Sequence, residues 1–144
     1  MSIVVITGPH AESDMPDPGS SAMCRLWERA QAAGVDLAWR RCDTFAQLSG
    51  CLEAPGDDAE LLLLDVDAEQ LPSALVDPVR DALSALRVPY IEVHDRSAAT
   101  DASSLAPGHP SLVSVVVPGN AIAGYDMALS IGLRFLKDAT RLAA

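Results

Sequence analysis

Basic side chains are scarce in this chain of 144 residues, which carries 10 Lys and Arg against 20 Asp and Glu and a formal charge of −10. Lys137 is the only lysine, and the sequence contains no run of basic residues. Nucleic acids and anionic membrane surfaces are bound through clustered Lys and Arg that neutralise phosphates. The composition therefore argues against both kinds of partner, and we expect neither nucleic acid nor a membrane.

Long apolar runs are also missing. The longest, Leu61–Leu64 and Val115–Val117, are far shorter than the roughly 20 residues needed to cross a bilayer. Residues 2–6 enter a β-branched run directly, without the basic segment and cleavage site of a signal peptide. The cysteines are odd in number and form no C-x-x-C pair, which disfavours a disulfide framework or a zinc site. We expect a cytoplasmic protein with free thiols, and its use of Arg in place of Lys is typical of GC-rich bacterial genomes.

Short apolar runs alternate with amphipathic segments along the chain, which is the pattern of a parallel sheet covered by helices. Apolar residues make up 49 % of the sequence, enough for one sizeable core. The predicted strands are Ile3–Thr7, Val35–Arg40, Glu60–Val66, Pro89–His94 and Leu112–Val117. The sequence therefore predicts a single domain over residues 1–144, a flavodoxin-like α/β fold with five parallel strands doubly wound by helices.

The helices between these strands carry recognisable start signals. The first begins near Ser20 or Ser21 and ends before Gly34, and Asp43 or Thr44 caps the second. Asp77-Pro78 reads as the start of the third, because proline is favoured at a first helical position. The fourth runs from Pro118-Gly119 to about Leu142. The first helix places an apolar stripe on one side, made of Met23, Leu26, Trp27 and Ala30.

Ligands of such sheets bind beyond the carboxyl ends of the strands, where two histidines, His10 and His94, fall. Glu92 and His94 are two residues apart on one strand, so their side chains leave the same face. A carboxylate beside an imidazole fixes its tautomer and raises its pKa, which suits a general acid. The alternative interpretation is a solvated strand end that merely carries these two residues.

Two further features of this edge have more than one interpretation. Asp65 and Asp67 follow the third strand and could join a histidine around a divalent ion, but solvated loop carboxylates explain them better. The segment Gly119–Gly124 is a weak match to a glycine-rich turn and does not predict dinucleotide binding. We therefore expect no metal and no cofactor. The loop Asp95–Pro110 is long, hence functional or mobile, and His109 within it is expected to face solvent.

Four segments in order resemble the type II 3-dehydroquinate dehydratases over nearly the whole chain. Ile6–His10 looks like that family's I-N-G-P-N, and Asp43–Leu48 is similar to its segment after the second strand. Arg80–Leu83 resembles its R-D-A, while Pro89–His94 reads P-Y-I-E-V-H and resembles its most specific block, P-x-I-E-V-H. Gly119–Leu129 is similar to its closing G-x-G-x-x-G-Y-x-x-A-L.

The resemblance implies a lyase that removes water from a cyclic β-hydroxyketone through an enolate. It makes His94 the general acid, Glu92 its orienting partner and His10 the replacement for the family's Asn. It also implies a small-molecule substrate, and self-association into trimers that form a dodecamer. The residues expected to contact substrate are Asp65, Asp67, Arg80, Asp81, Asp95 and Arg96, the last pair through backbone amides.

The part of the site that holds the family's catalytic base differs in this sequence. The family's Tyr and its activating Arg have no counterpart between Gly8 and Gly19, and acidic residues gather where the family binds an anion. One hypothesis is a divergent acid–base enzyme that acts on a less anionic substrate, with a new base from His10 or Asp65. The other is a non-catalytic binding or assembly protein, a pseudoenzyme. Genuine 3-dehydroquinate dehydratase activity is a minor third.

Overall fold

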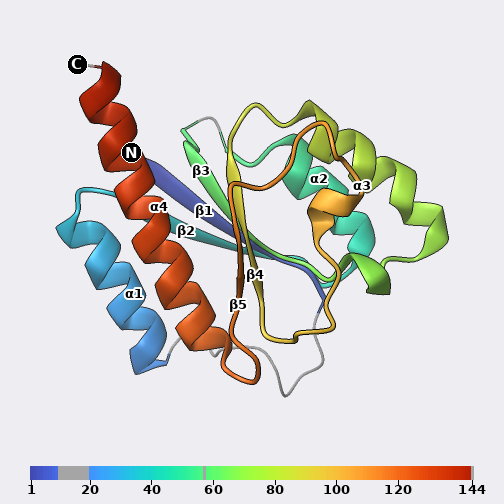
Figure 1. The fold of residues 1–144 in the computed structure, drawn as a ribbon, viewed down its shortest axis with the longest axis horizontal. Coiled ribbons are helices and arrows are strands. Elements are labelled where there is room, and N and C mark those ends of the chain that lie inside the picture. The colour runs from blue at the N-terminus through green and yellow to red at the C-terminus, as the bar shows by residue number, and fades with distance from the viewer. Residues whose placement is uncertain (10–19, 57, 144) are drawn as a thin grey trace.

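The computed structural model describes residues 1–9, 20–56 and 58–143 and contains a five-stranded sheet in which every strand pair is parallel (Figure 1). The strands stand in the order β2-β1-β3-β4-β5. This is the flavodoxin-like order, so the predicted fold class is confirmed. The strands are β1 (Ser2–Thr7), β2 (Asp36–Arg41), β3 (Leu61–Asp65), β4 (Tyr90–His94) and β5 (Ser114–Val116).

Two pairs of helices cover the sheet, one pair on each face (Figure 1). The helices are α1 (Ser21–Ala32), α2 (Phe45–Glu53), α3 (Ser73–Ala85) and α4 (Ala121–Ala143), and two short 3-10 turns are η2 (Ala68–Gln70) and η3 (Ala102–Ser104). Helices α1 and α4 share one face, and α2 and α3 the other. Among the described helices, none combines the length and apolar character needed to span a bilayer.

Alternation along the strands divides the core into two layers. Side chains from Ile3, Leu61 and Ile91 pack towards α1 and α4. Their neighbours Val4 and Leu62 pack towards α2 and α3, because successive strand residues point to opposite faces. Strands β1 and β3 are buried throughout apart from Ser2, as expected for parallel strands between two helical layers. This parity also decides which side of the sheet each polar strand-end residue faces.

The predicted helix caps are confirmed at α1 and α2. Ser20 accepts a hydrogen bond from the backbone N–H of Met23 at 3.3 Å, and Thr44 accepts one from Gln47 at 3.3 Å. These side chains satisfy amide groups that the first helical turn leaves unpaired. Gly34 follows α1 with φ of +74°, a left-handed conformation that glycine adopts without strain.

The predicted start of α3 at Asp77-Pro78 is wrong. The helix begins at Ser73, so Pro78 is its sixth residue and lies inside it. Proline at this position has no N–H to give to the carbonyl one turn earlier, and its ring crowds that carbonyl. Val79, Ala82 and Leu83 of this helix are buried, and their packing holds the helix together across the proline.

The predicted stripe of α1 is correct for three of its four members. Met23, Leu26 and Ala30 are buried, whereas Trp27 is 50 % exposed. Trp27 borders a shallow apolar hollow of about 200 Å³ that Leu37 and Trp39 of β2 also line. The indole therefore covers the margin of an edge strand and does not enter the core.

Candidate functional site

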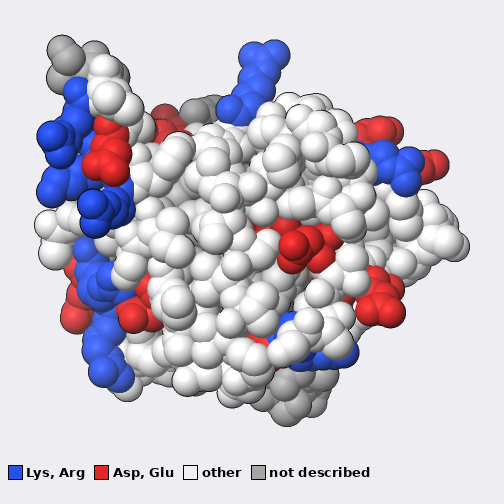
Figure 2. Space-filling view, viewed as in Figure 1, with Lys and Arg blue, Asp and Glu red and all other residues white. Residues whose placement is uncertain are grey.

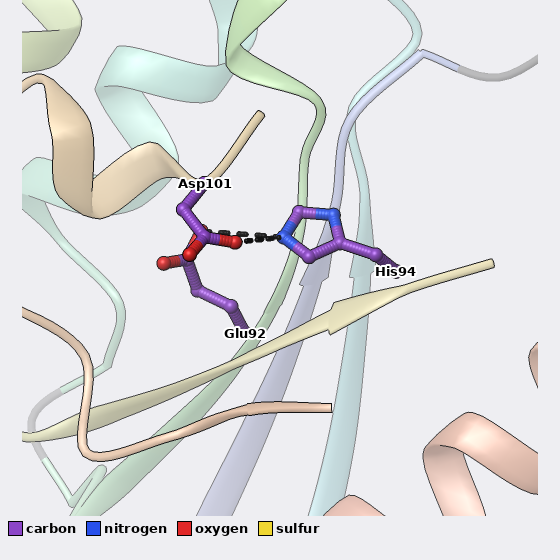
Figure 3. A group of neighbouring side chains, drawn as sticks. All are labelled: Glu92, His94 and Asp101. Atoms are coloured by element: carbon purple, nitrogen blue, oxygen red, sulfur yellow. Dashed lines mark ion pairs between the residues drawn. The ribbon is translucent and has the colours of Figure 1, made fainter. Parts of the chain in front are cut away.

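Three titratable side chains meet at the carboxyl end of β4. Glu92 and His94 leave the same face of the strand, and Asp101 approaches from the loop just before η3 (Figure 3). His94 Nε2 lies 3.0 Å from Asp101 Oδ1 and 3.6 Å from Glu92 Oε1. Glu92 is 0 % and His94 3 % exposed, so the alternative of a solvated strand end is wrong. We call these three residues the Glu92–His94–Asp101 cluster.

Glu92 is fixed by the start of η3. The backbone N–H of Ala102 donates to Oε1, and both the N–H (3.2 Å) and the hydroxyl (2.5 Å) of Ser103 reach Oε2. Burial acts to raise the pKa of this carboxyl, but the contact with His94 and these hydrogen bonds together lower it. Glu92 is therefore an anion held in one orientation.

The environment of His94 favours its protonated form. Burial acts to lower its pKa, but the contact with Glu92 and the charges of Glu92, Asp101 and Asp65 raise it above the ordinary value. Nε2 is buried and finds no well-aligned hydrogen bond among the described residues, although both carboxylates stand within ion-pair distance. The ring edge that carries Nδ1 faces away from the carboxylates (Figure 3). Nε2 is thus held by acidic groups, and Nδ1 faces away from them.

The other buried carboxylate of this edge, Asp65, lies in a different setting. The Tyr125 hydroxyl, from α4, donates to Asp65 Oδ2, and the Tyr125 ring meets Trp39 edge-on at 5.0 Å between centroids. Burial and the Asp65 charge raise the pKa of Tyr125 well above its usual range. Asp65 is 6 % exposed, so the expectation of a solvated carboxylate is wrong for this residue.

Strand parity separates Asp65 from the cluster. The Asp65 side chain points to the face of the sheet that α1 and α4 cover, as does Thr7, its partner on β1 in the register. The side chains of Glu92 and His94, like that of Tyr90, point to the face that α2 and α3 cover. The sequence correctly predicts that these residues share one edge of the sheet. The structure brings Glu92 and His94 together and places Asp65 on the opposite face of the sheet, where its charge still helps to raise the pKa of His94.

The remaining predicted substrate contacts have other surroundings. Asp67 is half-buried and accepts hydrogen bonds from the amides of Glu69 and Thr100, both at 3.0 Å, so it ties two loops together. Arg80 and Asp81 lie exposed on α3, with Arg80 paired to Asp77 at 2.8 Å. Arg80 and Asp81 are thus not brought to the cluster.

Four further residues singled out in the sequence are Asp95, Arg96, His109 and His10. Asp95 and Arg96 follow His94 directly, with Asp95 half-buried and Arg96 exposed. His109, expected to face solvent, is instead half-buried against the Tyr90 ring at 5.6 Å between centroids. His10 lies outside the described residues.

Asp101 is the member of the cluster that the sequence did not single out. It was recognisable only as one acidic residue of the long loop, seven positions after His94. The signal that points to it is the Ser103-Ser104 pair that follows, because hydroxyl residues favour tight turns. That turn, η3, folds the loop back over the end of β4.

Two open hollows lie at the opposite end of the sheet, where the amino ends of the strands gather. One of about 800 Å³ is lined by residues that precede β1 and β2 and by the end of α4. The other, of about 760 Å³, lies between the ends of α2 and α3. Neither is lined by the cluster. In folds of this class chemistry belongs to the carboxyl ends of the strands, so we place the candidate site at the cluster.

The strand order and the position of the cluster define a flavodoxin-like α/β protein whose polar strand ends gather at one edge. Comparison with known proteins narrows the fold further. No family model matches the sequence, and no curated protein does. Among the solved structures that match over nearly the whole chain are type II dehydroquinases and a 3-dehydroquinate dehydratase-like protein.

Three of these structures are representative. A 3-dehydroquinate dehydratase-like protein from Bifidobacterium longum is 17 % identical, with a TM-score of 0.64 over 94 % of this chain and 97 % of that one. The type II dehydroquinase from Propionibacterium acnes is 22 % identical, with a TM-score of 0.64 over 92 % and 98 %. The enzyme from Butyrivibrio crossotus DSM 2876 is 18 % identical, with a TM-score of 0.66 over 93 % and 97 %. The chain therefore has the fold of the type II dehydroquinases, as its motifs predicted.

Proposed function

We propose that this protein is an acid–base enzyme that eliminates water from a small, weakly charged β-hydroxy carbonyl compound, with His94 as the proton donor. The observation that carries this proposal is the arrangement of the imidazole, in which Nε2 stands against two carboxylates and Nδ1 faces away from them. Carboxylates on one side of an imidazole set its tautomer and stabilise its cation. The kinship in fold to dehydratases supports the same reaction type.

The proposed elimination has two steps. A base removes the proton next to the carbonyl and leaves an enolate. The enolate then expels the β-hydroxyl as the His94 Nδ1–H delivers a proton to it, so water departs and a conjugated enone remains. The candidate base is His10, which lies outside the described residues, because Tyr125 already engages Asp65 on the opposite face of the sheet. Glu92 keeps the ring oriented, because three donors from η3 fix its own position.

Charge supports a substrate that is less anionic than dehydroquinate. The described part of this edge contains two cations, Arg41 and Arg96, and Arg41 is paired with Asp43 at 3.7 Å. The acidic residues there are more numerous: Asp43, Asp65, Asp67, Glu92, Asp95 and Asp101. Two like charges about 4 Å apart repel by several kcal/mol at an effective dielectric constant near 20. A carboxylated substrate would meet this repulsion, and a neutral hydroxyketone would not.

The test is a series of β-hydroxy ketones, neutral and carboxylated, in which enone formation is followed by its ultraviolet absorbance. We expect turnover of a neutral member and a loss of about 10²- to 10⁴-fold in His94→Gln. His109→Gln, a histidine outside the cluster, is the matched control and should retain activity. Equal rates in His94→Gln and the parent protein would refute the role of His94. Turnover of dehydroquinate itself would refute the proposed substrate class.

A second candidate, a non-catalytic assembly protein, is favoured by two observations. Tyr125 and backbone amides already engage Asp65 and Asp67, so the described rim has no carboxylate placed as a base opposite His94. Exposed apolar residues occur just before β5, on β5 and on α4, where Leu112, Val116 and Met127 are 48 %, 44 % and 51 % exposed. In this alternative, inactivity across the whole substrate series would accompany stable self-association.

A further inference from the structure

The Glu92–His94–Asp101 cluster has the spacing of a metal site. In tetrahedral coordination with metal–ligand bonds of about 2.0–2.1 Å, neighbouring ligand atoms lie about 3.3 Å apart. The distances from His94 Nε2 to Asp101 Oδ1 and Glu92 Oε1 are 3.0 and 3.6 Å, on either side of that value. One ligand atom from each of the three residues fits within 4.8 Å of the others. Small side-chain rotations therefore suffice to close the three atoms around one ion.

The state of each ligand atom also favours a cation. His94 Nε2 is buried, points at the two carboxylates and has no hydrogen-bond partner among the described residues (Figure 3). The Asp101 carboxylate makes no capping hydrogen bond to η3, although it stands at the capping position. Two carboxylates beside a neutral imidazole carry two negative charges, which one divalent ion neutralises. A buried nitrogen donor and an uncommitted carboxylate are thus aimed at one point.

The surroundings supply the support that metal ligands normally have. Glu92 receives its hydrogen bonds from Ala102 and Ser103, and the Ser103 hydroxyl is itself bonded to Ser111 at 3.0 Å. Asp101 is fixed through its carbonyl, which accepts the amide of Ser104 at 3.1 Å and its hydroxyl at 2.7 Å. Hydrogen bonds of this kind orient ligating carboxylates in known metal sites. Asp101 is 46 % exposed in its side chain, which leaves a route for an ion and a water ligand.

We propose that Glu92, His94 and Asp101 bind one first-row divalent transition-metal ion, of which Zn²⁺ is the representative. One imidazole and two carboxylates suit such an ion better than Mg²⁺ or Ca²⁺, which take oxygen ligands. Water completes the coordination. This inference rests on the cluster alone and not on the proposed elimination. If both hold, a metal on Nε2 replaces the proton there, and Zn²⁺ inhibits the enzyme.

The test is calorimetric titration of the purified chain with Zn²⁺, together with the visible absorption of the Co²⁺ form. We expect one ion per chain, at least a ten-fold weaker affinity in Asp101→Asn, and a further loss in His94→Gln. Because Asp101 lies on a half-exposed loop, Asp101→Asn keeps the test valid even if His94→Gln does not fold. Asp138→Asn, an exposed carboxylate at the far end of α4, is the matched control and should bind normally.

The competing zinc ligands are the thiols of Cys42 and Cys51, whose sulfur atoms are 3.3 Å apart. Cys51→Ser should therefore leave binding unchanged, and the Co²⁺ spectrum should lack the intense thiolate bands. Binding that survives Asp101→Asn but disappears in Cys51→Ser would overturn the proposal, as would the absence of any stoichiometric binding. Neither result depends on a substrate, so this test and that of the elimination fail separately.

Discussion

Ser103 carries much of the local order around the cluster. Its amide and hydroxyl both reach Glu92, and the same hydroxyl contacts Ser111 and, at 3.3 Å, Tyr90. A hydrogen bond to a buried charged group contributes about 1.5–3 kcal/mol, more than one between neutral groups. The pair Glu92 and His94 was predictable, because two-residue spacing on a strand fixes a common face. Asp101 was not, because a loop's path depends on contacts such as those of Ser103.

Replacement of Ser103 by alanine tests this role. We expect Ser103→Ala to lower the free energy of unfolding by about 1.5–3 kcal/mol, measured by urea denaturation. Ser104→Ala removes a neighbouring hydroxyl that bonds only the Asp101 carbonyl, so its cost should stay below about 1 kcal/mol. Equal costs for the two variants would contradict the importance of the hydroxyl bound to Glu92.

The opposite pKa shifts of Glu92 and His94 predict a bounded pH window for stability. The pKa of His94 is raised on folding, so its contribution is complete below about pH 6.5 and is lost as the pH rises through the folded value. The pKa of Glu92 is lowered, so its contribution is present above its unfolded value and is lost in acid. Urea midpoints of the parent should fall on the alkaline side. The midpoint of His94→Gln should stay level there, and a parallel fall would contradict the assignment.

At the scale of elements, α4 approaches the sheet closely at Gly132. A Cβ built on Gly132 would lie 2.6 Å from Leu61 Cδ2, and Leu61 is fully buried. The existence of the strands and helices could be predicted from the apolar periodicity of the sequence, because a strand or helix with a buried face needs apolar residues at regular spacing. The start of α3 and the exposure of Trp27 did not follow. Both depend on packing against neighbours that the local sequence does not specify.

Two glycine substitutions separate packing from helix propensity. Gly132→Ala should lower the unfolding free energy by about 1–3 kcal/mol, because the added methyl overpacks the interface with Leu61. Gly50→Ala, in α2, meets no atom within 4 Å and should raise it by about 0.5–1 kcal/mol. The measurement is thermal or urea unfolding of both variants. A stabilised Gly132→Ala would show that α4 packs less closely than described.

At the scale of the whole molecule, charge and apolar surface are separated. The face drawn in Figure 2 has a broad area without charged side chains, with blue and red groups along its margins and one red group within the face. Exposed apolar residues of the β5 region and α4 are Leu112, Val113, Val116, Met127 and Ile131. An edge strand with exposed apolar side chains favours pairing with another copy. The net charge of −10 disfavours nucleic acid as a partner, but only the folded chain locates the exposed apolar residues.

Self-association through this surface is the corresponding prediction. Light scattering after size-exclusion chromatography should give a multiple of the 15.1 kDa chain mass. Val116→Lys should shift the chain towards monomer, because a charge on an edge strand opposes pairing. Trp27→Ser, which removes an equally exposed apolar residue on α1, should leave the assembly unchanged. A monomeric parent protein would contradict the prediction.

The contact of Trp39 with Tyr125 has a practical consequence for optical work. Tyr125 contacts Trp39 with its ring and Asp65 with its hydroxyl. One residue therefore separates the Trp39 indole from Asp65, at the carboxyl end of β3. The chain has two tryptophans, and Trp27 is the exposed one. Replacement of Trp27 by phenylalanine would leave Trp39 as the single tryptophan, whose fluorescence reports on the carboxyl ends of the strands. The protein thus carries its own label for ligand screening, without an attached dye.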